Sequence, residues 1–352
     1  MQKKLTTILV TAVVAGMMAT TASAATSKLR IQSHQSPETS QGRLIQQFVK
    51  NIHTASNGEI EIEMFYSAAV VKSAETFDAA QTGILDCDMT NGSYQTGKNP
   101  AFQFVADTMG GYDTPTQYLA WVNHGGGREQ INELYSQYGM SFIGAQVGGQ
   151  ESLNSTRPLR GVADLKNFKF RSPPGMESEI FASLGAKPIV MDFTEVFTAL
   201  ESGIVDGADA STLAVNTSIG IYDIAKHATF PGFHSMSSDQ LACNTEVWNK
   251  LPQNHQRIVE MAHKTLMADY VMVTMIENGE ALAKMPSKGV TTYDWSAEDR
   301  AVFRSAAQKS WKSWGAKTPE AREMVNSHEA FLCGMLCFRR FSAGSSPGIN
   351  RV

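Results

Sequence analysis

The chain has 352 residues, of which 42% are hydrophobic and 18% are charged, as is typical of a globular protein. Its formal net charge is −4 with mixed signs, so it has no basic face of the kind that binds nucleic acid. A chain of this length exceeds what one ordinary core supports, and we therefore expect two domains.

The N-terminal residues carry the pattern of an export signal. Lys3 and Lys4 precede an apolar run, Ile8–Met18, and small residues follow at 22–24. This order is typical of a secretory signal peptide, and the run is about half of the roughly 20 residues that a membrane span needs. We predict that residues 1–24 are removed and that the mature chain lies in the periplasm; a membrane anchor is the disfavoured alternative.

The cysteines are too few and too scattered for a disulfide-rich scaffold. They stand at Cys87, Cys243, Cys333 and Cys337. In an oxidising compartment Cys333 and Cys337 are close enough in sequence to pair, and four unpaired thiols are the equally favoured alternative.

The first part of the mature chain alternates strands and helices. Its apolar residues recur with a period of two in the strands and with helical spacing between them, and Asn57-Gly58 ends the first helix as a left-handed cap does. The predicted elements are strand 28–33, helix 44–52, strand 59–65, helix 74–82 and strand 84–89. This order is typical of a largely parallel sheet that helices cover on both faces.

A second series of strands and helices begins after the middle of the chain. It comprises strands 141–146 and 168–171, helix 177–184, strand 188–191, helix 195–201 and strand 205–208, and then long helices at 254–284 and 297–312. Two such series predict an α/β protein with two lobes. The tail, residues 333–352, contains Arg339-Arg340 and has no helical period, so we expect it to be disordered or peripheral.

Signatures of catalysis are absent from the sequence. It has no G-x-S-x-G, H-E-x-x-H, Walker A or paired C-x-x-C motif, which argues against an enzyme. Arg171 is the candidate for binding an anion, because it ends an apolar strand just before a Ser-Pro-Pro-Gly turn. Ligands of α/β sheets bind beyond such strand ends, and arginine pairs well with carboxylates. A surface arginine that closes the strand is an equal alternative.

The segment 161–210 resembles the periplasmic receptors of tripartite ATP-independent (TRAP) transporters. It contains Asp-Leu-Lys-Asn-Phe-Lys-Phe-Arg and, further on, Ala-Leu-Glu-Ser-Gly-Ile-Val-Asp-Gly-Ala-Asp, which are similar in order and spacing to two family motifs. The resemblance extends over about residues 28–312. Gly97–Phe102, Trp121 and Phe230-Pro231-Gly232 look like the branch that binds α-keto acids and related monocarboxylates.

The resemblance implies a set of ligand-binding residues. In the family the arginine at the place of Arg171 binds the ligand's carboxylate, and a glutamine about 21 residues earlier, here Gln150, touches ligand and cation. The family's acidic residue and tryptophan correspond to Asp209-Ala210, so the tryptophan is lost. Tyr94 is a candidate hydroxyl donor from the first lobe, with a core aromatic as the alternative.

The resemblance also implies a metal site, which this sequence alters. The family positions for a bridging Na⁺ or Ca²⁺ ion fall on Gln150, Asp209 and Ser235, and the last replaces a glutamate. Asp239 is near enough in sequence to substitute for it. A second family arginine falls on Glu151, and a single arginine favours a monocarboxylate over a dicarboxylate.

The implied fold is a two-lobed periplasmic binding protein (type II-like) with an interlobe ligand cleft and long C-terminal helices. We expect lobe I at 25–148 and 238–277, lobe II at 149–237 and 278–305, and a helical segment at 306–332. The implied partners are a small carboxylate, the membrane permease and, through a C-terminal helix, a second copy of the chain. A ligand-sensing receptor and an exported hydrolase are the alternative functions.

Overall fold

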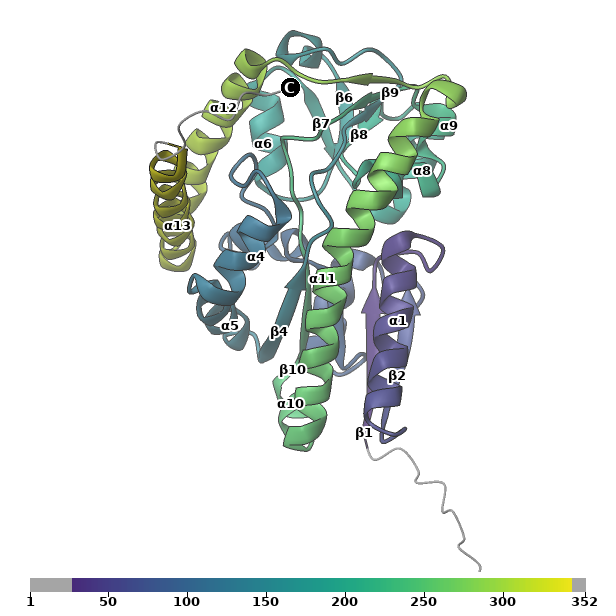
Figure 1. Cartoon of the computed structure of the whole chain (residues 1–352), viewed down its shortest axis with the longest axis vertical. Helices are drawn as coiled ribbons and strands as arrows, with labels where there is room; N and C mark the ends of the chain where they lie inside the picture. Colours follow the sequence, from purple (N-terminus) through teal and green to yellow (C-terminus); the bar gives the residue numbers. More distant parts are fainter. Residues whose placement is uncertain (1–26, 344–352) are drawn as a thin grey trace, which may run out of the picture.

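The structure is a computed structural model that describes residues 27–343, and the side chains of residues 27–335. The predicted signal peptide lies outside the described residues. Within them the chain forms two sheets, each covered by helices, which confirms the predicted two-lobed α/β fold (Figure 1). The predicted lobe boundaries remain a proposal.

The first sheet has five strands in the order β2-β1-β3-β10-β4. Strand β1 pairs in parallel with β2 and β3, as the sequence predicts, whereas β10 runs antiparallel between β3 and β4. The strands are β1 (Ser27–Ser33), β2 (Ile60–Tyr66), β3 (Cys87–Asn91), β4 (Met140–Gln146) and β10 (Asp239–Asn244). The central place of β10 was not predicted, because its partners lie far away in the sequence.

Helix α1 (Ser40–Ala55) illustrates how local sequence sets these elements. The Thr39 side chain accepts a hydrogen bond from the Gly42 N–H, which caps the helix N-terminus. The helix ends before Asn57 and Gly58, whose φ angles of 51° and 79° confirm the predicted left-handed cap. The other helices of this lobe are α2 (Thr76–Gln81), α3 (Phe102–Ala106), α4 (Pro115–His124), α5 (Gly127–Ser136) and α10 (Thr245–Lys250).

The second sheet has six short strands in the order β11-β9-β5-β8-β6-β7. They are β5 (Asn154–Ser155), β6 (Lys169–Ser172), β7 (Lys187–Val190), β8 (Gly207–Ala208), β9 (His227–Thr229) and β11 (Thr291–Tyr293). The helices between them are α6 (Met176–Ser183), α7 (Val196–Glu201), α8 (Leu213–Ser218) and α9 (Ile221–Ile224). Strand β6 is parallel to both of its neighbours, so its carboxyl end points the same way as theirs.

Helix α11 (Gln253–Lys284) is long enough to touch both lobes. It packs on α1 and β4 in the first and on α8 in the second (Figure 1). Helices α12 (Ala297–Gly315) and α13 (Pro319–Ala343) follow and pack against each other. In residues 27–343 no helix combines the length and apolar character that crossing a bilayer requires.

Helix α13 corrects the prediction for the C-terminal tail. We expected residues 333–352 to lack helical structure, yet α13 continues to Ala343. Residues 344–352 lie outside the described part of the chain. The composition of the whole tail hides the fact that its first half continues the preceding helix.

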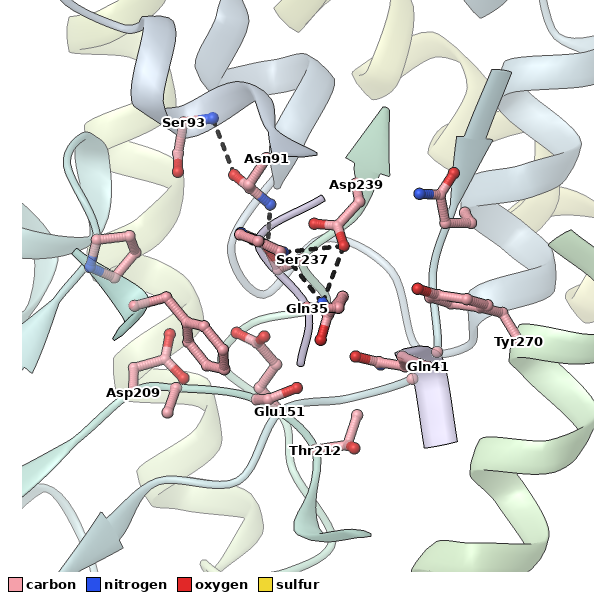
Figure 2. Close-up of a pocket in the computed structure, with 18 of the residues that line it drawn as sticks. Gln35, Gln41, Asn91, Ser93, Glu151, Asp209, Thr212, Ser237, Asp239 and Tyr270 are labelled. Atoms are coloured by element: carbon pink, nitrogen blue, oxygen red, sulfur yellow. Dashed lines mark hydrogen bonds and ion pairs between the residues drawn. The ribbon is translucent and has the colours of Figure 1, made fainter. Parts of the chain in front are cut away.

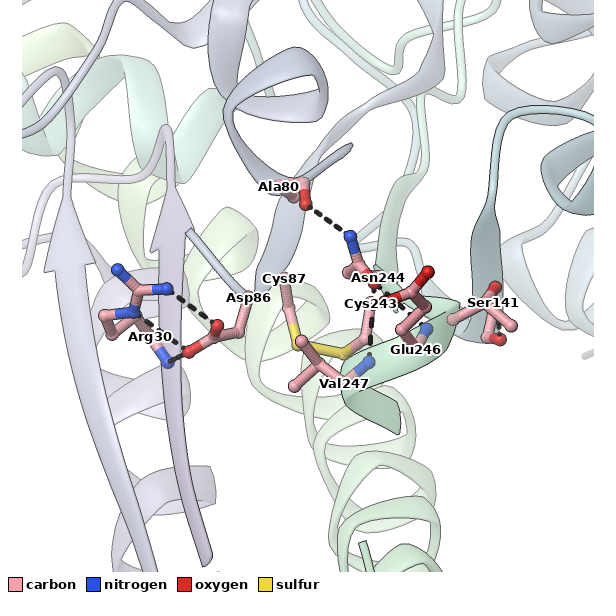
Figure 3. Close-up of a disulfide and its surroundings, with 10 residues drawn as sticks. Arg30, Ala80, Asp86, Cys87, Ser141, Cys243, Asn244, Glu246 and Val247 are labelled. Atoms are coloured by element: carbon pink, nitrogen blue, oxygen red, sulfur yellow. Dashed lines mark hydrogen bonds and ion pairs between the residues drawn. A yellow bond between two sulfur atoms is a disulfide. The ribbon is translucent and has the colours of Figure 1, made fainter. Parts of the chain in front are cut away.

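A disulfide joins Cys87 to Cys243, which corrects both predictions for the cysteines (Figure 3). The two residues lie directly opposite each other on β3 and β10, with their Cα atoms 3.9 Å apart. Cys333 is free and exposed. The pair was missed because 156 positions separate the two residues in the sequence and only the strand register brings them together.

Candidate functional site

A cavity lies between the two lobes, at the ends of strands from both sheets. The first lobe contributes residues that follow β1, β3 and β4, and the second contributes residues from β6 and after β8. Figure 2 shows Asp209, Glu151 and Thr212 facing Asn91 and Gln35. The lining includes His34, Gln35, Gln41, Asn91, Ser93, Tyr94, Gln146, Glu151, Arg171, Asp209, Ala210, Ser211, Thr212, Asp239 and Tyr270.

Arg171 lines this cavity and is only 3% exposed, so it is not a surface arginine. Its Nε donates to the Met191 carbonyl at 3.1 Å and its Nη1 donates to the Asp209 carbonyl at 2.6 Å. Two of its five N–H groups are therefore used, and within the described residues Nη2 makes no hydrogen bond. The two carbonyls hold the guanidinium in one orientation while leaving donors for a ligand.

Three other predicted residues lie in the same cavity. Tyr94, Asp209 and Ala210 all line it together with Arg171. Burial raises the pKa of the Tyr94 hydroxyl, and the charge of Arg171 opposes that rise. The tyrosine therefore stays neutral and can donate a hydrogen bond into the cavity.

Gln150 and Ser235 do not line the cavity, contrary to the prediction. Gln150 borders a separate hollow, and its Nε2 donates to the carbonyls of Tyr112 and Asp113. The Ser235 hydroxyl is buried, 2.6 Å from carboxylate oxygens of both Asp107 and Glu151. Gln150 was predicted from its separation from Arg171 along the sequence. Such a separation is unreliable here, because an irregular loop joins β4 to β5.

Gln146 lines the cavity from the end of β4, and the sequence did not predict it. It ends β4, and its Oε1 lies 2.7 Å from Nε2 of His263, while its Nε2 is buried without a partner. Burial lowers the pKa of His263 to about 3, so the ring is neutral at physiological pH. The signal that identifies Gln146 is its place directly at the carboxyl end of a buried strand.

Several polar atoms around the cavity have no protein partner. They are Nδ1 of His34, Oε1 of Gln35, Oε1 of Gln41, Oγ of Ser93, Nε2 of Gln146 and the hydroxyl of Tyr270. All of them come from the first lobe and α11. A buried polar atom without a partner costs roughly 1–3 kcal/mol, so a bound molecule that supplies partners is favoured here.

His34 and Asp239 form an ion pair at the first-lobe wall. His34 Nε2 lies 3.1 Å from Asp239 Oδ2, and the amide of Gln35 donates to the same oxygen. Burial by itself lowers the pKa of His34, but the attraction of Asp239 outweighs it and the net pKa is raised. This wall therefore carries a balanced pair rather than a second free cation.

Comparison with known proteins agrees with this architecture. Residues 31–318 match the family model for "Bacterial extracellular solute-binding protein, family 7". The chain belongs to this family. It is 28% identical over 264 residues to a monocarboxylate 2-oxoacid-binding periplasmic protein of Nostoc sp., covering 74% of this chain and 70% of that protein. The family consists of solute-binding proteins of TRAP transport, so the prediction that the chain is not an enzyme is confirmed.

Two solved structures share the fold of this chain. A TRAP solute-binding protein of Rhodobacter sphaeroides, in an open form without ligand, is 34% identical, covers 88% of this chain and 98% of its own, and gives a TM-score of 0.70. One of Pseudoalteromonas atlantica T6c, with bound sodium and pyruvate, is 24% identical, covers 90% and 97%, and gives 0.80. The less similar sequence superposes better.

Two hydrogen bonds join the lobes of this family 7 chain. The Met176 N–H on α6 donates to Oε1 of Gln103 on α3 at 2.7 Å. The Ala74 N–H donates to Asp192 Oδ2 at 3.3 Å. Both bonds cross from one lobe to the other beside the cavity. The two lobes are therefore in direct contact in this structure.

The three residues predicted to hold a bridging Na⁺ or Ca²⁺ ion do not meet in the cavity, although Asp239, the predicted substitute, lines it beside Asp209 and Glu151. Gln150 faces another hollow, Ser235 is hydrogen-bonded to two carboxyl groups, and Oε1 of Gln146 is taken by His263. Among the described residues, only Asp209 of the predicted trio lines the cavity. The sodium of the solved relative therefore has no matching ligand set in Gln150, Asp209 and Ser235.

Proposed function

We propose that the chain is the periplasmic receptor of a TRAP transporter, that it captures a small organic carboxylate at Arg171, and that it delivers this ligand to the membrane permease. The observation that carries the proposal is a buried arginine with unused donors in a cavity that both lobes enclose. Family membership and the signal pattern of residues 1–24 support export to the periplasm.

In this proposal, closure of the two lobes strengthens the contacts between the ligand and the protein. In the open form Arg171 is hydrated, and closing the lobes replaces water with the ligand and with first-lobe groups such as Tyr94. The hydrogen bonds of a carboxylate to a guanidinium then strengthen, because the local dielectric falls. The ligand shifts the population towards the closed form only as far as it binds that form better.

The unpartnered atoms narrow the class of carboxylate. Oε1 of Gln35 and Oε1 of Gln41 are acceptors, so they need a donor from the ligand or from water. A hydroxyl group beside the carboxylate supplies such a donor, whereas a 2-oxo group only accepts. The lining also holds unpartnered donors, Gln146 Nε2 and the Tyr270 hydroxyl, which suit a 2-oxo oxygen. It therefore favours a monocarboxylate with a second oxygen beside the carboxylate, either a hydroxy acid or a 2-oxo acid.

Ligand-dependent stabilisation tests the proposal. Thermal unfolding of the mature protein is followed with lactate, pyruvate and succinate, and a ligand at 100 times its Kd stabilises by about 2.7 kcal/mol. Arg171→Ala should abolish the shift. Arg157→Ala is the matched control, because Arg157 also donates to two backbone carbonyls in lobe II, those of Asp164 and Lys166. Equal binding by Arg171→Ala and wild type would refute the site.

Delivery to a permease and self-association stay separate proposals. Uptake of the ligand in cells that carry the receptor and its permease tests the first. For the second, we expect α13 to contribute to a homodimer, as the resemblance implies. Light scattering of the mature chain, with and without residues 319–352, distinguishes a dimer from a monomer.

A further inference from the structure

Three ionisable side chains converge at the cavity wall, and two of them, Glu177 and His234, lie outside the predicted ligand set. Glu177 comes from α6, Asp209 follows β8, and His234 follows β9. Their candidate ligand atoms all lie within 4.8 Å of one another. The residues are 2%, 1% and 0% exposed, so bulk water does not compensate their charges.

Glu177 is the member of this group that most needs a partner. Neither of its carboxylate oxygens accepts a hydrogen bond from a donor group, and both are buried. The group that faces it is another carboxyl, that of Asp209. A buried carboxylate without a donor is costly, which points to a missing cationic or protonated partner.

The surroundings add negative charge rather than remove it. Glu151 approaches Asp209 as a third buried carboxyl group, and burial together with Asp209 raises the pKa of both Glu151 and Glu177. Arg171 is the nearby guanidinium, but its hydrogen bond to Asp209 goes to the backbone carbonyl. Asp107, which shares the Ser235 hydroxyl with Glu151, is a fourth buried carboxyl group beside them. Four carboxyl groups thus share one guanidinium and one imidazole.

We propose that Glu177, Asp209 and His234 bind a divalent transition-metal ion of the Zn²⁺ or Mn²⁺ class. Two carboxylates and one imidazole nitrogen are a donor set that such ions favour, whereas Na⁺ and Ca²⁺ take oxygen ligands. The 3.2 Å between His234 Nε2 and Asp209 Oδ1 is compatible with two ligands of one ion. The site shares only Asp209 with the predicted trio and differs from it in metal class.

The ion positions the ligand-binding wall and does not itself hold the ligand. Asp209 lines the cavity, and its carbonyl accepts from Arg171 Nη1. Neither Glu177 nor His234 lines the cavity. The ion joins α6, the end of β8 and the segment after β9. It thereby fixes the backbone carbonyl of Asp209, which orients the Arg171 guanidinium.

Metal binding to the whole mature protein tests the proposal. After removal of metals by a chelator, Zn²⁺, Mn²⁺ and Ca²⁺ are titrated separately by calorimetry. We expect one ion of Zn²⁺ or Mn²⁺ per chain, bound more tightly than Ca²⁺. Glu177→Gln and His234→Asn should each weaken binding by more than the roughly 10- to 100-fold that losing an outer-sphere partner causes.

Glu179→Gln is the matched control on the same helix. Its carboxylate bonds to Trp314 and Lys317 away from the cluster, so metal binding should be unchanged. Co²⁺ added to the wild type gives a readout that needs no variant, since binding at a mixed nitrogen and oxygen site produces visible absorption bands. Absence of these bands together with no Zn²⁺ or Mn²⁺ binding to the wild type would overturn the proposal, as would unchanged binding by the two site variants. A proton shared by Glu177 and Asp209 would then be the occupant.

Discussion

Reduction of the bond between Cys87 and Cys243 is expected to destabilise the first lobe strongly. The bond closes a loop with a sequence separation of 156 residues. In the chain-entropy model such a loop lowers the entropy of the unfolded chain by an amount equivalent to about 5 kcal/mol at 25 °C. Both sulfurs are buried in the core of the sheet, so the thiols left after reduction stay in an apolar setting and add little further cost.

Urea unfolding of the oxidised and the reduced protein, without ligand, measures this difference. The midpoint should fall on reduction, and Cys87→Ala/Cys243→Ala should lie near the reduced wild type. Cys333→Ala is the control, because that thiol is exposed and free, and its midpoint should not change. Equal midpoints for the oxidised and reduced forms, with the bond confirmed by mass spectrometry, would refute the loop-closure reasoning.

Three further perturbations follow from buried polar contacts. Burial lowers the pKa of His263 and His328 to about 3, so on acidification the unfolded chain takes up protons at these residues before the folded chain does. Each histidine should therefore lower the free energy of unfolding by about 1.4 kcal/mol per pH unit as the pH falls below about 6.5. Urea midpoints at pH 7.5 and 5.5 check this, and a flat profile contradicts it. Gln146→Leu should weaken ligand binding by removing a cavity donor, which calorimetry measures. Thr39→Ala should lower stability by about 1 kcal/mol through loss of the cap of α1, measured by urea unfolding.

Local sequence patterns predicted much of the fold and less of the candidate site. Helix α11 was predicted at 254–284 and runs from Gln253 to Lys284, because a helical period over that length is a strong local signal. Strand β10 and the pairing of Cys87 with Cys243 depend on contacts between distant segments, which no local pattern contains.

The site followed the same division. Arg171, Tyr94, Asp209 and Ala210 meet in the cavity, as the resemblance implies. Gln150 was predicted from its separation from Arg171 along the sequence, and such a separation is unreliable across the loop between β4 and β5. Glu177 reads in the sequence as an ordinary acidic residue in the first turn of a helix, and only the approach of β8 and the segment after β9 exposes its lack of a partner.

The position of β10 determines when the first sheet can be completed as the chain emerges. A chain that emerges from the export channel N-terminus first delivers β3 and β4 early, yet the strand that pairs with both arrives only after β5 to β9 have followed. Until then the edges of β3 and β4 that β10 covers in the folded protein have unpaired N–H and C=O groups, and such edges can pair with neighbouring chains. A stalled or truncated export product that ends before residue 239 should therefore be prone to aggregation.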